Sequence, residues 1–428
     1  MFETISNFIR VGEIRRKIVF TLLMLVVFRL GSFIPVPGVN AEVLKLSDQG
    51  VFGLLNTFGG GALKNFSIFA MGIMPYITAS IIIQLLQMDV VPKFTEWSKQ
   101  GEVGRRKLAQ FTRYGTIVLG FIQAVGMSIG FNNMFPGLIN NPGLPTYLLI
   151  ALVLTAGTAF LLWLGELITS HGVGNGISII IFGGIVAAIP TAANQIYAQQ
   201  IEGAGEALFL RIVTIVLLLV AVIAVIVGTI FISQALRKIP IQYAKRLVNR
   251  SPVGGQSTHL PIKVNAAGVI PVIFAISFLI TPPTIAGFFG TNKVTTWITT
   301  TFTYSHPIGM IIYVALIIAF TYFYTFVQVN PEQMAENLQK QGGYVPGIRP
   351  GKSTQEYLTR ILYRLTLVGS IFLAIIAVLP VFFVNIAGLP QSVQIGGTSL
   401  LIVVGVALET MKQLESQLVK RHYKGFLK

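Results

Sequence analysis

The fragments Ala-Met-Gly-Ile-Met-Pro (residues 70–75) and Ala-Ala-Gly-Val-Ile-Pro (residues 266–271) stand near the starts of two hydrophobic segments, at equivalent places in the two halves of the chain. Each places a glycine and a proline three residues apart. In membrane proteins with internal repeats, Gly and Pro at corresponding positions mark where helices break or part around a passage. The pair predicts two related halves around a pore, although Gly and Pro are common enough in membrane helices to leave chance agreement open.

Composition places the chain among membrane proteins. Of its 428 residues, 53% are hydrophobic and only 11% are charged, whereas an ordinary soluble domain carries about a quarter charged residues. Residues 212–232 and 365–384 form apolar runs close to the roughly 20 residues that a helix needs to cross a bilayer. We therefore predict an all-α polytopic membrane protein.

Hydropathy predicts ten membrane-spanning helices. The expected spans are 18–34, 68–88, 113–131, 146–166, 177–193, 211–232, 264–286, 306–328, 362–383 and 398–411. Ten spans divide into an N-terminal half (residues 1–200) and a C-terminal half (residues 201–428). Because five is odd, a second copy of a five-helix unit would be inverted in the membrane. Two turn-rich stretches, 142–145 and 281–284, are expected to break helices.

The basic residues are distributed unevenly between the two sides. Of the 31 Lys and Arg residues, 26 fall at the two ends of the chain or in alternate connections, including the long loops 233–263 and 329–361. By the positive-inside rule, both termini and these loops are cytoplasmic.

Catalysis and charge-coupled transport are both disfavoured. The four histidines are scattered, the chain has no cysteine, and no known catalytic or metal-binding motif appears. The span interiors hold amides and hydroxyls, such as Gln84, Gln123 and Ser277, rather than the charges that coupled carriers place there. No enzyme activity, metal or cofactor is expected, and a pathway for an uncharged solute remains open.

Two pairs of isoleucines lie four residues apart on predicted helices, so each pair shares a helix face. They are Ile73 with Ile77 and Ile177 with Ile181. Packing between helices and an apolar constriction of a pore are both consistent with this spacing.

Three connecting segments combine features that permit either a plain or a functional interpretation. Residues 56–67, before the second span, contain three glycines beside Leu63 and Phe66, which suits either an external loop or a segment that buries itself. Residues 237–246 and Arg349, between two prolines, are basic and cytoplasmic. They either set topology or dock a partner, including RNA phosphates.

Seven stretches, in order along nearly the whole chain, resemble the SecY family of bacterial protein-translocation channels. They are Met71-Gly-Ile-Met-Pro-Tyr-Ile-Thr-Ala-Ser-Ile-Ile-Ile-Gln-Leu-Leu86, Gly101-Glu-x-Gly-Arg-Arg-Lys107, Gly172-x-Gly-Asn-Gly-Ile-Ser178, Pro240-Ile-Gln-Tyr243, Val264-Asn-x-Ala-Gly-Val-Ile-Pro271, Ile348-Arg-Pro-Gly351 and Gly396-Gly-Thr-Ser-Leu-Leu-Ile402. Departures are minor: Thr78 stands where the family pattern has Ser, and the tail after Lys412 matches loosely.

The resemblance implies two inverted five-helix halves that enclose an hourglass pore, and it assigns roles by position. The pore ring falls on Ile73, Ile77, Ile177, Ile181, Ile270 and Ile402. The plug, about residues 57–66, falls on Phe58, Gly59, Gly60, Gly61, Ala62, Leu63 and Phe66. The lateral gate, between spans two, three, seven and eight, falls on Thr78, Ser80, Gln123, Asn265 and Ser277, with Gln123 and Asn265 expected to pair. The residues expected to dock a motor or ribosome are Arg237, Lys238, Tyr243, Lys245, Arg246 and Arg349.

The resemblance also implies partners and a location. The chain is expected in the bacterial plasma membrane as a passive channel subunit, driven by the SecA ATPase or by the ribosome. The small membrane subunits SecE and SecG, signal peptides, nascent polypeptides and membrane lipids complete the set of expected partners.

Overall fold

Among the described residues, one helix overlaps each of the ten predicted spans. In the first half these helices are α2 (Gly12–Gly31), α4 (Met74–Leu86), α6 (Glu102–Met134), α7 (Leu144–His171) and α8 (Gly176–Gln200). In the second half they are α9 (Leu208–Gln234), α10 (Ile270–Gly287), α12 (Pro307–Gln328), α14 (Lys352–Ala387) and α15 (Ile395–Gly425). This computed structural model describes residues 11–44, 56, 59–88, 90–200, 208–243, 246–248, 251–253, 257–287, 292–303, 306–387 and 395–425.

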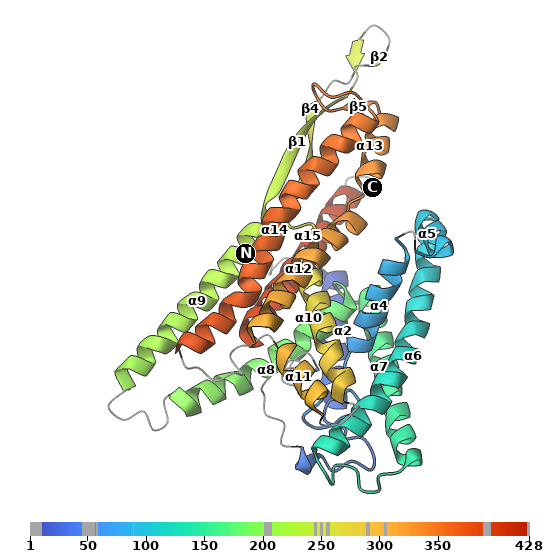
Figure 1. The fold of residues 1–428 in the computed structure, drawn as a ribbon. Helices are drawn as coiled ribbons and strands as arrows, with labels where there is room; N and C mark the ends of the chain where they lie inside the picture. Colours follow the sequence, from blue (N-terminus) through green and yellow to red (C-terminus); the bar gives the residue numbers. More distant parts are fainter. Residues whose placement is uncertain are drawn as a thin grey trace.

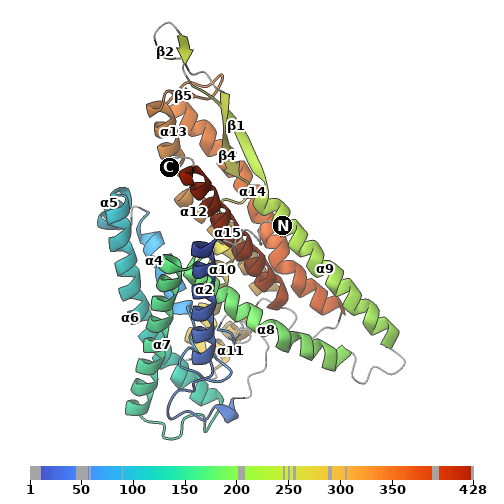
Figure 2. The same cartoon turned by 180° about the vertical axis from the view of Figure 1, so that it is seen from behind.

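The helices differ in how well they satisfy the length and hydropathy required of a membrane span. Among the described residues, six helical segments are long and apolar enough to cross a membrane, while α4 and α10 are shorter apolar helices. Figures 1 and 2 show α4, α6 and α7 on one side and α9 and α14 on the other, with α10 and α12 between them. Helix α10 packs on α12 of its own half and also on α4 and α6 of the other half.

The two Gly-x-x-Pro fragments adopt matching local structures. Gly72 and Gly268 have φ angles of +55° and +64°, a region that favours glycine because it lacks a Cβ atom. In both fragments the helix begins two residues after the glycine, and the proline is its second residue. Helices α4 and α10 therefore start at residues 74 and 270 rather than at the predicted 68 and 264, because these glycine turns precede them.

Residues 281–284 do not end a helix, contrary to the sequence-based expectation. Helix α10 continues through Pro282 and Pro283 to Gly287. Nearby hydroxyls bond to helix carbonyls: Thr281 donates to Ser277 O at 2.7 Å and Thr284 donates to Ile280 O at 2.8 Å. These side-chain bonds flank the carbonyls that the prolines leave without an N–H donor.

The two long polar connections, predicted as loops, fold together into one small unit. Strands β1 (Leu236–Tyr243) and β4 (Ser257–Lys263) pair antiparallel, with Ile239 opposite Leu260, and β5 (Gly343–Tyr344) joins the other edge of β1. A second pair, β2 (Arg246–Val248) and β3 (Ser251–Val253), lies between β1 and β4 along the chain. Helix α13 (Pro331–Lys340) and the start of α14 cover this sheet through a core of their own, which contains Ile239, Ile241, Ile262, Ala335, Leu338, Val345, Leu358 and Leu362.

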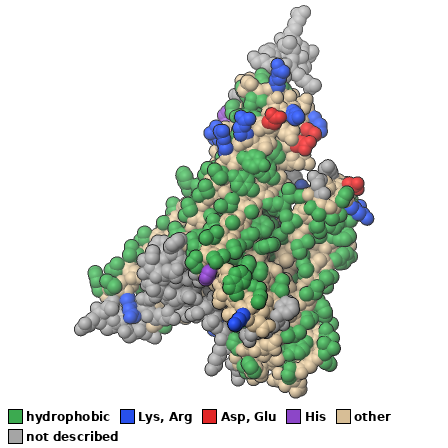
Figure 3. All heavy atoms as spheres, viewed as in Figure 1, with side chains coloured by type: hydrophobic (Ala, Val, Ile, Leu, Met, Phe, Trp, Pro, Cys, Tyr) green, Lys and Arg blue, Asp and Glu red, His purple; other side chains and the backbone are tan. Residues whose placement is uncertain are grey.

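The surface repeats the division between apolar helices and polar connections. Figure 3 shows hydrophobic side chains across the middle of one face, while most of the visible Lys and Arg residues gather near β5 and α13 and beside α5 (Pro92–Lys99). A large exposed apolar surface beside a charged end is the pattern expected of a protein surrounded by lipid.

Candidate channel constriction and gate

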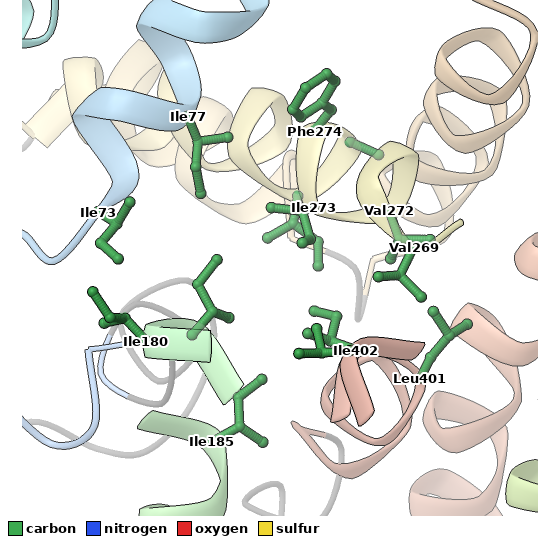
Figure 4. Packing of buried hydrophobic residues seen from close by; sticks show 14 of the residues in the cluster. Ile73, Ile77, Ile180, Ile185, Val269, Val272, Ile273, Phe274, Leu401 and Ile402 are labelled. Carbon is green, nitrogen blue, oxygen red and sulfur yellow. The ribbon is translucent and has the colours of Figure 1, made fainter. Parts of the chain in front are cut away.

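The six isoleucines assigned to the pore ring all belong to, or pack against, one large hydrophobic cluster. Ile73, Ile77, Ile181 and Ile402 are buried in it, and Ile177 and Ile270 pack against it while partly exposed. Figure 4 shows Ile73 and Ile77 from the α4 region, Ile273 from α10 and Ile402 from α15 facing a common centre. Helices distant in sequence therefore bring these side chains together, which helical spacing along one segment could not establish.

A small cavity lies inside this cluster. Among its lining residues are Gly59, Ile73, Ile77, Ile181, Ile273 and Ser277, and every residue that lines it is uncharged. Two of the residues that line the cavity, Ile273 and Ile276, were not assigned to the site from the sequence. The signal for them was present, because Ile273 and Ser277 lie four residues apart on the same helix face.

The described part of the predicted plug is buried rather than an exposed loop. Ala62, Leu63 and Phe66 are fully buried. Ala62 belongs to the isoleucine cluster, whereas Leu63 and Phe66 belong to a second cluster with Phe131 of α6. The segment therefore connects the constriction to the packing of the first half. Phe58 lies outside the described residues.

Glycines allow the backbone of this segment to pass close to its neighbours. Gly60 and Gly61 have φ angles of +64° and +88°. A Cβ atom on Gly60 would lie 3.2 Å from Gly184 Cα and 3.4 Å from the Phe28 ring. The chain at Gly60 is thus held against α2 and α8, and a larger residue would meet both strain and crowding.

Polar contacts attach the same segment to the end of α2. The Arg29 Nη1 donates a hydrogen bond to Gly60 O. Asn65 Nδ2 donates to Ser32 O at 3.3 Å, and the Val36 N–H donates to Phe66 O at 3.0 Å. Phe66 itself is the one described non-glycine residue with a positive φ, 41°.

The polar residues assigned to the lateral gate bond mainly within their own helices. Thr78 donates to Met74 O at 3.1 Å, and Ser277 donates to Ile273 O at 2.8 Å. Ser80 accepts a hydrogen bond from Gln84 Nε2 at 3.2 Å. Hydroxyls tied to the carbonyl one turn earlier need no partner on a neighbouring helix.

The expected pairing of Gln123 with Asn265 is not formed in this structure. Asn265 Nδ2 donates instead to Gly268 O at 3.1 Å, within the turn that begins α10. The Asn265 Oδ1 is buried without a hydrogen-bond partner. Among the described residues, no hydrogen bond joins the two amides, so Asn265 here stabilises the glycine turn of its own segment.

The residues assigned to docking lie on or beside the small sheet. Arg237 and Lys238 are exposed on β1, and Tyr243 at its end packs against the core of the sheet. Arg246 begins β2, and Lys245 lies outside the described residues. Arg349 is exposed in a turn between Gly347 and Gly351, whose φ angles are +81° and +96°.

A buried threonine fixes the backbone of this arginine. Thr354, which is 2% exposed, donates its hydroxyl to Arg349 O at 2.9 Å. The neighbouring Ile348 packs against the same core as Tyr243. The two basic connections, separated by about a hundred residues in sequence, therefore lie together on one small folded unit.

A protein with several apolar helices, an uncharged cavity inside a hydrophobic cluster and a buried glycine-rich segment beside that cavity fits the class of membrane channels. The comparisons agree with this class. The SecY family model matches residues 67–411. A protein translocase subunit SecY from Bacillus licheniformis is 77% identical over 431 residues, covering 100% of both chains. The chain belongs to the SecY family.

Solved structures share the fold at low sequence identity. One described as a protein-conducting channel has a TM-score of 0.63 at 20% identity, covering 95% of this chain and 93% of that one. Sec61 in a canine ribosome–channel complex has a TM-score of 0.60 at 18% identity, covering 95% of this chain and 93% of that one.

Proposed function

We propose that this chain, as a member of the SecY family, is a protein-conducting channel that passes unfolded secretory polypeptides across the plasma membrane. The convergence of the six isoleucines in one cluster carries the proposal. Branched aliphatic side chains can close around chains of varied sequence because apolar contact is non-directional. They also offer no charge to which a passing polypeptide could bind.

The segment around Gly59–Phe66 acts as the plug of the closed channel. Gly59 lines the same cavity as Ile73 and Ile181, so the segment lies directly against the constriction. The Arg29 guanidinium attaches it to α2, while Leu63 and Phe66 are buried in the first half. Passage of a polypeptide requires this segment to leave the constriction.

Hydrophobic segments leave sideways between α4 and α6 on one side and α10 and α12 on the other. Helix α10 packs on both α4 and α6 across this seam. The hydroxyls of Thr78 and Ser277 form hydrogen bonds within their own helices. Both hydroxyls therefore keep these hydrogen bonds when the helices separate and face lipid. An apolar segment partitions into the bilayer through this seam because lipid solvates it better than water does, and a polar segment continues across.

Partners supply the energy, since we assign the chain itself no enzymatic role. The basic surface of the small sheet, with Arg237, Lys238 and Arg349, docks the SecA ATPase or the ribosome. A ribosome partner is consistent with the similarity to Sec61 in a ribosome–channel complex. SecE and SecG are the expected membrane subunits, and residues 1–200 and 201–428 form the two inverted halves.

Orientation follows from the charges. The connections that carry most Lys and Arg residues face the cytoplasm, together with both termini. The end of the molecule that carries β5 and α13 (Figure 3) is then the cytoplasmic end.

Single-channel current in planar bilayers without substrate tests the constriction. We expect Ile73→Ser combined with Ile402→Ser to raise resting ion conductance and relax the demand for a good signal sequence, because polar groups hydrate the constriction. The controls are Ile→Val at both positions, which retains an apolar seal, and Ile223→Ser on the exposed face of α9. A variant with all six isoleucines replaced by serine is made as well and checked to be monodisperse. If both variants give the resting current of the parent, these isoleucines only pack the helices together and do not seal a pore.

A further inference from the structure

A short helix links the far ends of two helices that line the seam. Helix α11 (Lys293–Thr301) follows α10 and precedes α12, and it packs against both. It lies at the end of these helices that is remote from β1 and β4 (Figure 1). With nine residues it is too short to span a bilayer.

Helix α11 exposes two apolar side chains while two of its threonines are buried. Thr295 in its first turn and Thr301 at its last residue are 8% and 4% exposed, whereas Val294 and Trp297 are 67% and 60% exposed. Residues three apart lie on the same side of a helix. We call Val294 and Trp297 the apolar flank of α11.

Both ends of the helix are well defined. At its start, Asn292 and Thr295 form a reciprocal capping box. At its end, Gly309 of α12 lies so close that a Cβ atom there would be 2.5 Å from Thr301 O and 2.2 Å from Thr303 O. This close approach holds the end of α11 against the start of α12.

Three threonine hydroxyls at and just after α11 form hydrogen bonds to nearby backbone carbonyls and do not need water as a partner. Thr299 donates to Thr296 O at 2.9 Å, and Thr303 donates to Thr299 O at 2.7 Å. Thr300 donates to Thr296 O and Trp297 O, at 2.9 and 3.1 Å. Hydroxyls satisfied by their own helix suit an environment of low polarity.

We propose that α11 lies in the boundary between lipid headgroups and acyl chains, with its apolar flank inserted in the leaflet. The occupant of this surface is lipid, because the two spans on which α11 packs also expose apolar side chains near the same end. Those are Ile285 near the end of α10 and Ile308 and Ile311 at the start of α12, at 48%, 49% and 69% exposure. Trp favours this boundary, and Lys293 reaches the headgroups.

The anchor has a consequence for the seam, and this consequence rests on the proposed function. Helices α10 and α12 belong to one side of the lateral exit, so α11 holds their far ends at a fixed depth. The seam would then open by movement of α10 and α12 together, pivoting at this end. The anchoring itself does not depend on the role of the seam and is tested without transport.

Tryptophan fluorescence measures the depth directly, because the chain contains three Trp residues. The full chain carrying Trp97→Phe and Trp163→Phe retains Trp297 alone. It is reconstituted in phosphatidylcholine–phosphatidylglycerol vesicles with bromine at the headgroup end or the far end of the acyl chains. We expect blue-shifted emission, strong quenching by bromine near the headgroups, weaker quenching by deep bromine, and little quenching by aqueous iodide.

Two further variants separate insertion from a folding defect. In the single-Trp protein, Val294→Asp should raise iodide quenching several-fold, since it places a charge in the apolar flank while an acidic residue suits the first turn of a helix. The matched control Thr299→Asp, on the far side of α11, should leave both quenchers' effects unchanged. Strong iodide quenching without bromine quenching would show that Trp297 faces water. Weak quenching by both would show a protein partner instead, and either result overturns the proposal.

Discussion

The guanidinium of Arg29, near the end of α2, donates a hydrogen bond to the backbone carbonyl of Gly60 in the buried glycine-rich segment. The Arg29 Cζ also lies 4.7 Å from the centroid of the Phe33 ring, a distance at which cation and ring attract each other. Arg29 is one of the few basic residues outside the clustered set. In this structure it contacts the segment that we propose as the plug.

Replacing Arg29 by Gln is therefore expected to loosen the plug. A hydrogen bond to a charged group contributes roughly 1.5–3 kcal/mol, so its loss should shift the closed-to-open ratio by about tenfold or more. Resting current in planar bilayers is the measurement. The control is Lys64→Gln, which removes a positive charge from an exposed position of the same segment. If both variants leak to the same small extent as the parent, Arg29 does not hold the plug.

Gly176→Ala is expected to destabilise the first half strongly. A Cβ atom on Gly176 would lie 1.8 Å from Gly165 O and 2.7 Å from Gly165 C, where α8 starts against α7. Backbone atoms cannot move aside as a flexible side chain can, so the cost should reach or exceed the usual 1–3 kcal/mol of overpacking.

Thermal unfolding in detergent, followed by the loss of monodisperse protein, measures this cost. The matched control is Gly12→Ala, because Gly12 is also the first residue of a helix and a Cβ there meets nothing within 4 Å. Equal midpoints for the two variants would contradict the close approach of α7 and α8.

Hydropathy predicted the ten helices because each must cover its backbone polar groups within lipid, but it set several boundaries incorrectly. Residues 68–73 and 264–269 are mostly apolar, yet they form turns because Gly72 and Gly268 adopt positive φ angles. The strand β1 also escaped notice, although Ile239 and Ile241 are buried between exposed Lys238 and Gln242. That alternation has the period of a strand and could have been recognised beneath the basic composition.

The sequence predicted some contacts of the candidate site and missed others. The isoleucine pairs followed from helical spacing, but their meeting with Ile402 depends on tertiary packing, and only the family resemblance indicated it. The bond from Arg29 to Gly60 had no signal at all, because 31 residues separate the partners. The pairing of Gln123 with Asn265 was expected from the resemblance, whereas Asn265 bonds to the nearby carbonyl of Gly268 instead.

The sidedness of the molecule can be tested at two exposed lysines in this cysteine-free chain. A single cysteine at Lys238, on β1, should be protected from a membrane-impermeant maleimide in intact cells and become reactive in inverted vesicles. A cysteine at Lys293, on α11, should show the reverse pattern, because an odd number of spans separates the two positions. Labelling of position 238 from outside intact cells would invert the proposed orientation.

Arg349→Glu is expected to impair motor-driven export without harming the fold. The side chain is exposed, while the backbone of its turn is held by Thr354 and flanked by glycines with positive φ. Reversal of the charge should therefore leave expression and membrane insertion intact. An unfavourable charge at a docking surface costs several kcal/mol, so ATP-driven export by SecA into reconstituted vesicles should fall at least about tenfold.

The matched control for this charge reversal is Lys352→Glu, three residues further on. Lys352 is exposed at the first position of α14, where an acidic side chain suits the helix dipole. The substitution Lys352→Glu changes the net charge of the surface by the same amount as Arg349→Glu. If general electrostatic attraction alone docks the motor, the two variants should lose export equally. If the turn at Arg349 is a specific contact, export should fall in Arg349→Glu and remain near the parent rate in Lys352→Glu. Parental rates in both variants would remove Arg349 from the docking surface.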